Sequence, residues 1–189
     1  MDNRTNLLRV ALRLFATHGY DGVGVQQIVT EAGVTKPTLY HYFHGKLGLF
    51  QSLVEEKSDP LLADLKAAAH YEGDLTKSIT AVTQLYFDFL QREPFFYRLM
   101  LATWFMPPSS DVYSVIHDFQ SKQFALVEQM FLDAVSHHGN MRGRHKQYAV
   151  SLRGMIDTYV GLALQGHLQL GSDDMNYRIV HQFMHGIFS

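Results

Sequence analysis

Five side chains suited to binding nucleic acid fall within the short segment from residue 36 to residue 43. They are Lys36, Thr38, Tyr40, His41 and Tyr42. Lysine binds phosphate or guanine, threonine and tyrosine hydroxyls suit phosphate oxygens, and a histidine ring can touch a base edge or pack on a sugar. The two tyrosines could instead pack inside the protein, but their clustering with two lysines favours a polyanionic partner.

Three short helices are expected to position these side chains. Apolar residues recur at helical spacing between about residues 3 and 18, which predicts an amphipathic helix. A two-turn helix over residues 25–32 would stop at Gly33. The third helix would begin after Thr35 as its N-cap and run to about Phe43. A short helix, a tight turn with glycine and a second short helix form a helix-turn-helix, which places one helix in the major groove of DNA.

The third helix is expected to bury one of its faces. Leu39 and Phe43 are four residues apart and would point toward the core. Pro37 falls in the first turn, where its missing N–H costs nothing. The polar and aromatic side chains of this helix would therefore be exposed.

Two segments resemble a known family, FATHGYDGVGVQQIVTEA and GVTKPTLYHYFHGKLGLF. They are similar to the DNA-binding region of TetR-type (tetracycline-repressor-like) bacterial transcriptional regulators, over residues 4–53. The resemblance implies a ligand-responsive repressor that binds a palindromic operator as a homodimer. It also implies a C-terminal domain that binds a small, largely apolar effector, which releases the DNA.

The resemblance also assigns residues to the DNA interface. Lys46 stands at the start of the fourth helix, where family members often contact phosphate, and its charge would join the N–H groups of a helix N-terminus. The second helix often opens with Thr or Ser in the family, but here Gly24 and Val25 stand there, so a glutamine would supply the contact. The expected DNA contacts are Gln26, Gln27, Thr35, Lys36, Pro37, Thr38, Tyr40, His41, Tyr42 and Lys46.

Charge and composition limit the class of function. Residues 1–50 carry five basic and three acidic side chains, a net charge of +2, whereas the remainder carries 11 basic and 15 acidic ones. This asymmetry permits a polyanionic partner at the N-terminus. Its modest size leaves open an alternative, a helical small-molecule binding protein whose helix-turn-helix is not used on DNA.

Enzyme, cofactor and membrane signatures are not found. The chain has no cysteine, no nucleophile elbow, no phosphate-cradling glycine loop and no HExxH motif, so neither catalysis nor a cofactor is expected. Arginines interrupt the apolar positions near the N-terminus, and the most apolar stretch, 94–108, is too short to span a membrane. A cytoplasmic protein without a membrane partner is expected.

The rest of the chain also reads as helical. A long helix from Lys46 is expected to kink or restart at Ser58-Asp59-Pro60, because proline removes a backbone donor. Further helices are expected at about 75–91, 94–105, 110–138, 146–170 and 174–188. The prediction is an all-α protein of about nine helices, with a helix-turn-helix domain over 1–46 and an effector-binding and dimerisation domain over 47–189.

Aromatic and methionine residues crowd the middle of the chain. Ligand pockets are mainly apolar with few polar groups, so some of these side chains are expected to line an effector cavity. The candidates are Met100, Trp104, Phe124 and Tyr159, with His117 as a polar anchor. Packing in the core is the alternative for each of them, because helical periodicity does not separate pocket from core.

The last two helices are expected to form the homodimer. Their apolar residues are Ile156, Tyr159, Val160, Ala163, Leu164, Leu168, Tyr177, Val180, Met184, Ile187 and Phe188. Pairing these helices with their symmetry mates would bury this surface in a four-helix bundle. The small residues Gly154, Gly161, Ala163 and Gly166 would allow close approach. Packing within one chain is the alternative for each position.

Histidines suggest partial metal sites. His181 and His185 lie one turn apart, and His137, His138 and His145 surround a loop at residues 139–140. No carboxylate completes either group at tight spacing, so solvated or interface histidines are expected, and no metal site.

Overall fold

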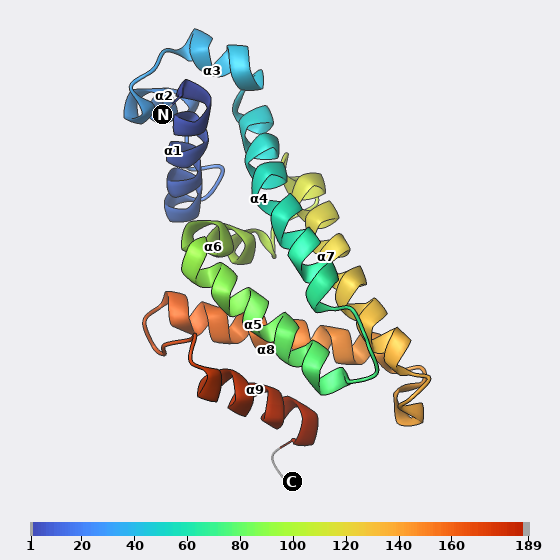
Figure 1. Ribbon diagram of the computed structural model, residues 1–189. Helices are drawn as coiled ribbons and strands as arrows, with labels where there is room; N and C mark the ends of the chain where they lie inside the picture. The colour runs from blue at the N-terminus through green and yellow to red at the C-terminus, as the bar shows by residue number, and fades with distance from the viewer. Residues whose placement is uncertain (1, 187–189) are drawn as a thin grey trace. The chain divides into compact units, whose positions relative to one another are not determined.

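The computed structural model describes residues 2–186, which form nine α-helices, one short 3₁₀-helix and no strand (Figure 1). The predicted all-helical fold is confirmed. In chain order the elements are α1 (Asn3–His18), α2 (Val25–Ala32), α3 (Lys36–Phe43), α4 (Lys46–Ala68), α5 (Leu75–Arg92), α6 (Pro94–Thr103), α7 (Tyr113–Ala134), η1 (Gly139–Met141), α8 (His145–Leu164) and α9 (Asp173–His185).

The helices pack into two compact units. The first comprises the chain through Pro60 together with Phe95–Phe119, and the second comprises Leu61–Pro94 together with the chain from Gln120 onward. The first unit therefore includes α6 and continues beyond residue 46, where the sequence places the end of the DNA-binding domain. That boundary between functional domains stays a prediction.

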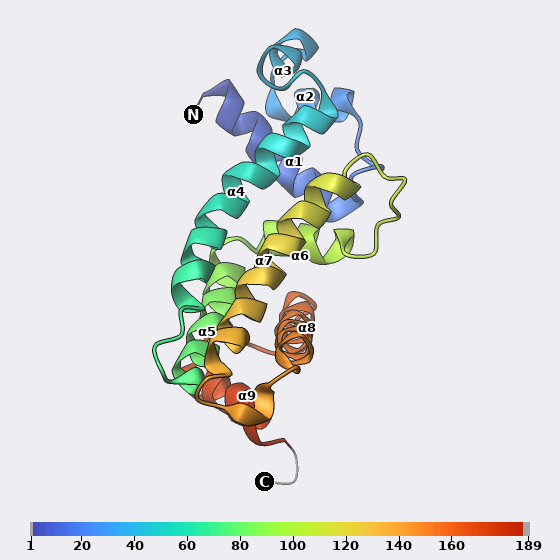
Figure 2. The ribbon, with the colours of Figure 1, turned by 90° about the vertical axis from the view of Figure 1, so that its right-hand side faces the viewer.

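The first three helices form where the sequence predicts them. The Asp2 carboxylate caps α1 by accepting the Thr5 N–H at 2.7 Å. Gly33 ends α2 with a left-handed backbone, φ 66°, which glycine adopts without steric cost. Thr35 is the N-cap residue of α3, although its hydroxyl bonds to the Thr38 hydroxyl at 2.9 Å and caps no backbone N–H. These helices pack on one another, and Figure 2 shows α2 and α3 meeting across their short turn.

Helix α4 is continuous through Ser58-Asp59-Pro60, where the sequence predicts either a kink or a restart. It runs from Lys46 to Ala68 with Pro60 inside it, so the restart is wrong and Asp59 begins no new helix. Leu61 and Leu65, which follow the proline, are fully buried. Their burial stabilises the helix against the loss of one backbone hydrogen bond at Pro60.

Four later helices, α6 to α9, are shorter than predicted because turns replace their ends. Helix α7 begins only at Tyr113, after a turn in which Ser110 N–H donates to Pro107 C=O at 2.9 Å. Helix α8 ends at Leu164, and Gly166 (φ 79°) then turns the chain. Helix α9 ends at His185, followed by the C-cap residue Gly186 (φ 74°), and the predicted interface residues Ile187 and Phe188 lie outside the described residues.

Helices α5, α8 and α9 form much of the second unit. Helix α9 is capped by Ser172, whose hydroxyl accepts the Met175 N–H at 3.2 Å, and it packs along α5. Asn176 donates to Gln84 Oε1 at 2.7 Å across this contact. Within residues 2–186 no helix has the length and apolar character needed to cross a membrane.

Candidate nucleic-acid interface

Helix α3 buries the two residues that the sequence predicts and exposes the rest. Leu39 and Phe43 are almost inaccessible to solvent, and in α2 the same holds for Ile28, Val29 and Ala32. These buried residues fix α3 against α1 and α2. The outer surface of α3 then consists of polar, cationic and aromatic side chains.

The outer surface of α3 carries most of the predicted DNA contacts. Thr35, Lys36, Pro37 and His41 are exposed, and Thr38 is half-buried. Tyr40 and Tyr42 are 50% and 40% exposed, and the His41 and Tyr42 rings meet edge to face at 5.2 Å. Two neighbouring tyrosines exposed to this degree are typical of a binding surface.

Lys36 is the exposed cation of this helix. It forms no ion pair within the part of the chain that the structure describes. Two of the three arginines of α1 differ, since Arg4 pairs with Glu56 at 2.8 Å and Arg13 pairs with Glu31. Lys36 is therefore an exposed cation that is available to neutralise a phosphate.

The predicted glutamine contacts in α2 have different environments. Gln26 is exposed, and its amide donates to the Thr30 hydroxyl at 3.1 Å on the same helix. Gln27 is half-buried. Gly24 is the N-cap residue of α2 and supplies no side-chain cap, as the sequence suggests.

Lys46 has a structural role that the sequence did not predict. Its ammonium donates to the backbone oxygens of Tyr20 and Val23, both at 2.8 Å, and lies 4.0 Å from the centroid of the Tyr20 ring. Burial lowers the pKa of Lys46, and the charges of Asp21 and Asp111 oppose that shift. The ammonium thus holds the turn between α1 and α2, and its predicted phosphate contact stays a prediction.

The turn between α3 and α4 is closely packed. His44 has φ 61°, and Gly45 has φ 141°. A Cβ atom at Gly48 would lie 1.9 Å from the Phe43 carbonyl oxygen, far inside van der Waals contact. Glycine at position 48 therefore lets α4 begin directly after the end of α3.

The five predicted effector residues are divided between the two units. In the first unit Met100 is buried, Trp104 is 46% exposed, and His117 is exposed and stacks on Tyr113 at 5.4 Å. In the second unit Phe124 and Tyr159 are half-buried. Neither unit brings all five together, and their role in effector binding stays a prediction.

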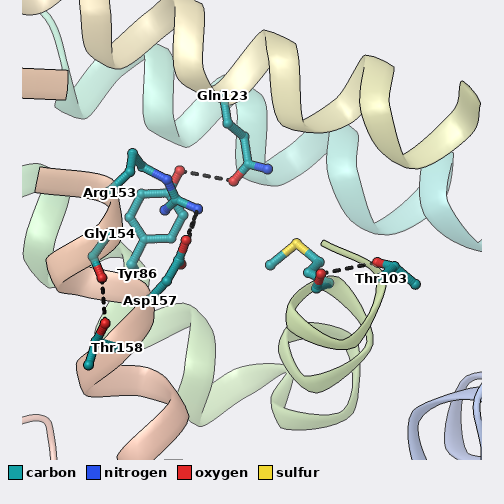
Figure 3. Close-up of polar contacts among 8 residues, drawn as sticks. Tyr86, Thr103, Gln123, Arg153, Gly154, Asp157 and Thr158 are labelled. Carbon is teal, nitrogen blue, oxygen red and sulfur yellow. Dashed lines mark hydrogen bonds and ion pairs between the residues drawn. The ribbon is translucent and has the colours of Figure 1, made fainter. Parts of the chain in front are cut away.

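A buried polar cluster in the second unit was not predicted from the sequence. We call Tyr86, Gln123, Arg153 and Asp157 the core polar cluster (Figure 3). The Tyr86 hydroxyl donates to Gln123 Oε1 at 2.9 Å, and Arg153 Nη2 lies 3.1 Å from each Asp157 carboxylate oxygen. The Arg153 guanidinium lies 4.0 Å from the Tyr86 ring centroid.

Burial dominates the electrostatics of the core polar cluster. Tyr86 is fully buried, and this desolvation raises the pKa of its phenol to about 12, although the Arg153 charge lowers it. The sequence does contain a signal for this cluster. Arg153 lies four residues after Ala149 and three before Ile156, so an arginine falls on the apolar face of α8.

A hollow of roughly 570 Å³ lies between the C-terminal ends of α5 and α8 in the second unit. Leu90, Leu164 and Leu168 contribute to its wall, and Gln91 spans its rim by donating to Leu170 C=O at 3.3 Å. None of the five predicted effector residues lines it.

The predicted dimer residues separate into core and surface. Ile156, Val160 and Val180 are buried within the second unit, so packing within the chain, the alternative, holds for these three. Exposed residues at four-residue spacing form a different stripe on α8, which we call the α8 stripe: Val150, Gly154, Thr158 and Leu162. Figure 3 shows the Thr158 hydroxyl donating to Gly154 C=O, at 2.8 Å, along it. Tyr177 and Met184 are exposed on α9.

The histidines do not gather into a metal site in the described part of the chain. No group of three or more His, Cys, Asp or Glu side chains able to hold a metal ion occurs there. The ring centroids of His181 and His185 lie 4.5 Å apart on α9. The His137 Nδ1 atom shares a hydrogen bond of 3.0 Å with the Tyr71 hydroxyl.

Comparison with known sequences gives a family match for the helix-turn-helix. Residues 7–53 match the bacterial regulatory proteins of the tetR family. The HTH-type transcriptional activator FasR of Mycolicibacterium smegmatis is 31% identical over 99 residues, which cover 52% of this chain and 45% of FasR. The chain spans about half the length, or less, of such curated relatives.

Solved structures with the same fold match nearly the whole length of the chain. A protein of Clostridium perfringens named as a candidate fatty acid metabolism regulator has a TM-score of 0.86 at 18% identity, covering 97% of this chain and 99% of that one. The regulator FadR of Bacillus subtilis, solved in complex with stearoyl-CoA, has a TM-score of 0.75 at 16% identity, covering 97% and 98%.

These matched proteins are regulators rather than enzymes. The matched segment contains the whole helix-turn-helix, from the buried face of α1 to the start of α4. Residues 7–53 therefore have the sequence of the N-terminal region found in the tetR family of bacterial regulatory proteins.

Proposed function

We propose that the chain is a ligand-responsive transcriptional repressor that binds a palindromic operator as a homodimer. The observation that carries the proposal is the exposed surface of α3, where Lys36, Tyr40, His41 and Tyr42 project from a helix fixed by Leu39 and Phe43. The other predicted contacts are Gln26, Gln27, Thr35, Pro37, Thr38 and Lys46. Such a regulator would act on DNA in the cytoplasm.

Dimerisation is proposed through α8 and α9. The α8 stripe is exposed and carries small or apolar side chains, and a Cβ atom at Gly154 would meet nothing within 4 Å. A symmetry-related helix can therefore approach α8 closely there. The two recognition helices of the dimer would lie about 34–36 Å apart, or a multiple of that spacing, to enter successive major grooves on one face of the duplex.

A fatty acyl compound is the proposed effector. Support comes from the FadR structure with stearoyl-CoA, whose fold this chain shares along almost its whole length. Effector binding would favour a conformer whose recognition helices no longer match the operator, with a coupling free energy of about 1–3 kcal/mol. We retain Met100, Trp104, His117, Phe124 and Tyr159 as candidate effector contacts.

Selection of fragments from genomic DNA by the purified protein tests the function. A palindrome recovered by the wild type should bind with a steep salt dependence, because phosphate contacts release counterions. Stearoyl-CoA should then release it. A folded dimer that enriches no fragment would favour the alternative, a small-molecule binding protein that does not use its helix-turn-helix on DNA.

The direction of regulation needs a separate assay, because the relative FasR is named as an activator. A reporter gene placed behind the recovered operator should be repressed by the wild type and derepressed by the effector. Higher expression with the protein than without it would identify an activator.

A further inference from the structure

Helix α9 presents two histidines together on one exposed face. His181 and His185 are four residues apart and both exposed, and their ring centroids lie 4.5 Å apart. Apart from contacts between rings, neither side chain has a hydrogen-bond or ion-pair partner within residues 2–186. Two imidazoles one helical turn apart offer two nitrogen ligands on the same side of a helix.

The segment HQFMH, residues 181–185, has the histidine spacing of a helical metal-binding motif. In the HExxH motif, two histidines at this spacing bind zinc and the glutamate between them is the general base. Gln182 stands where that motif has glutamate. The segment therefore has the two metal ligands of the motif and lacks its base, which fits metal binding without catalysis.

One chain supplies only half of a tetrahedral ligand set. Structural zinc sites use four protein ligands, and no third His, Cys, Asp or Glu side chain joins this pair in the described part of the chain. Asp174 lies on the same face of α9, but it pairs with Arg178 at 3.0 Å. A second copy related by a two-fold axis would supply the same two histidines and complete a set of four.

The surroundings of the pair suit contact with a second copy. The Tyr177 ring is 65% exposed, and its centroid lies 5.6 Å from that of His181, so three rings follow one face at four-residue spacing. Met184 is exposed beside them. The opposite face of α9 packs along α5, which leaves the ring-bearing face on the outside of the second unit (Figure 1). An exposed aromatic face without an uncompensated charge is typical of an interaction surface.

We propose that a divalent transition-metal ion binds between the α9 helices of two protomers, held by His181 and His185 of each protomer. The inference rests on the homodimer of the proposed function, in which α9 takes part, and adds an ion that holds the two copies together. Imidazole nitrogens suit zinc, nickel and copper. Zn²⁺ is the probe for the tests, because it takes four ligands in a tetrahedral arrangement and has no redox chemistry.

Zinc titration of the metal-free protein tests the ligands. Calorimetry should give one Zn²⁺ for every two chains, and His181→Gln and His185→Gln should each weaken zinc binding at least about tenfold, because each removes two of the four ligands. His167→Gln is the matched control, since His167 is exposed outside α9, and it should bind zinc as the wild type does. All three variants replace exposed side chains, so their metal-free melting temperatures should match the wild type. One Zn²⁺ per chain, no binding, or unchanged binding by either α9 variant would overturn the proposal.

Sedimentation analysis tests whether the ion holds two copies together. An ion that binds only the dimer lowers the dissociation constant of the dimer in proportion to its own saturation. At a free Zn²⁺ concentration about one hundred times the zinc dissociation constant, the dimer should therefore be about a hundredfold tighter, and EDTA should reverse the effect. A dimer dissociation constant that does not depend on zinc would overturn the proposal.

Cobalt(II) reports the coordination geometry. Its visible absorption is intense in a tetrahedral site and weak in an octahedral site, where water supplies most of the ligands. The wild type should give the intense spectrum, and Tyr177→Phe should keep it, because this variant retains the ring beside His181 and removes only the hydroxyl. A weak spectrum in the wild type, or a changed spectrum in Tyr177→Phe, would overturn the set of four histidines.

The failure of this inference and the failure of the proposed function give different results. If the metal-free protein forms a dimer that binds its operator, and Zn²⁺ changes neither property, the homodimer stands and the metal site fails. If the protein stays monomeric with and without Zn²⁺, both fail.

Discussion

Replacing Lys46 with alanine distinguishes two roles for this ammonium. The family resemblance implies a phosphate contact, whereas the structure shows that Lys46 Nζ donates to Tyr20 C=O and Val23 C=O. A phosphate contact would affect only DNA binding. A bond to the turn between α1 and α2 would affect the stability of the free protein as well.

The geometry of Lys46 sets the size of the effect. Each hydrogen bond to a charged donor contributes about 1.5–3 kcal/mol, and the contact with the Tyr20 ring adds about 0.5–1 kcal/mol. Burial of the ammonium, which also lowers the pKa of Lys46, offsets part of this gain. We expect Lys46→Ala to lose about 2 kcal/mol of unfolding free energy, or roughly 4–8 °C in melting temperature.

Urea unfolding and DNA titrations at several salt concentrations provide the assay. Lys46→Ala should be less stable and bind DNA more weakly, with an unchanged dependence of affinity on salt. Lys36→Ala is the control, because Lys36 is exposed. Its stability should stay within about 0.5 kcal/mol, and its salt slope should fall by about 1.8, which is about 0.9 for each of the two protomers on the operator. If Lys46→Ala keeps wild-type stability and its salt slope falls by about 1.8, the reasoning from the structure is refuted.

Three further predictions follow from the geometry. Gly48→Ala should lower the free energy of unfolding by about 1–3 kcal/mol and weaken DNA binding, because its Cβ would clash with Phe43 C=O. The control Gly139→Ala adds a Cβ that meets nothing within 4 Å, so it should change neither property. Equal melting temperatures for the two variants would contradict this prediction. Gly154→Arg should stay folded but elute as a monomer in light scattering, and a dimeric mass would place the interface elsewhere. Burial raises the pKa of Tyr86 from 10.0 to about 12, so the stability that the neutral phenol confers is complete below pH 10 and is lost between pH 10 and about pH 12. The phenolate absorbance of the wild type and of Tyr86→Phe should therefore coincide up to about pH 11. A difference at lower pH would refute the burial argument.

The fold of the helix-turn-helix was predictable because its determinants are local. Helical spacing, the stop at Gly33 and the Leu39 and Phe43 pair all lie within a few residues of the elements they specify. The ends of α7 and α8 were not predictable, since apolar residues continue beyond them at helical spacing and the turns depend on backbone conformations such as that of Gly166.

Non-local contacts account for what the sequence did not predict. Lys46 contacts a turn more than 20 residues earlier, and Tyr86 meets Gln123 from a different helix. The continuity of α4 through Pro60 depends on the burial of Leu61 and Leu65, which local propensity does not contain. The outward face of α3, by contrast, follows from periodicity alone.

Fluorescence anisotropy of the recovered operator tests the central claim, that the exposed face of α3 binds DNA. Tyr42→Ala should bind at least about tenfold more weakly than the wild type, while Phe105→Ala, which removes an aromatic ring that is 89% exposed outside α3, should bind as tightly as the wild type. Wild-type affinity in a folded Tyr42→Ala protein, with an unchanged salt slope in Lys36→Ala, would show that α3 is not the surface that contacts DNA.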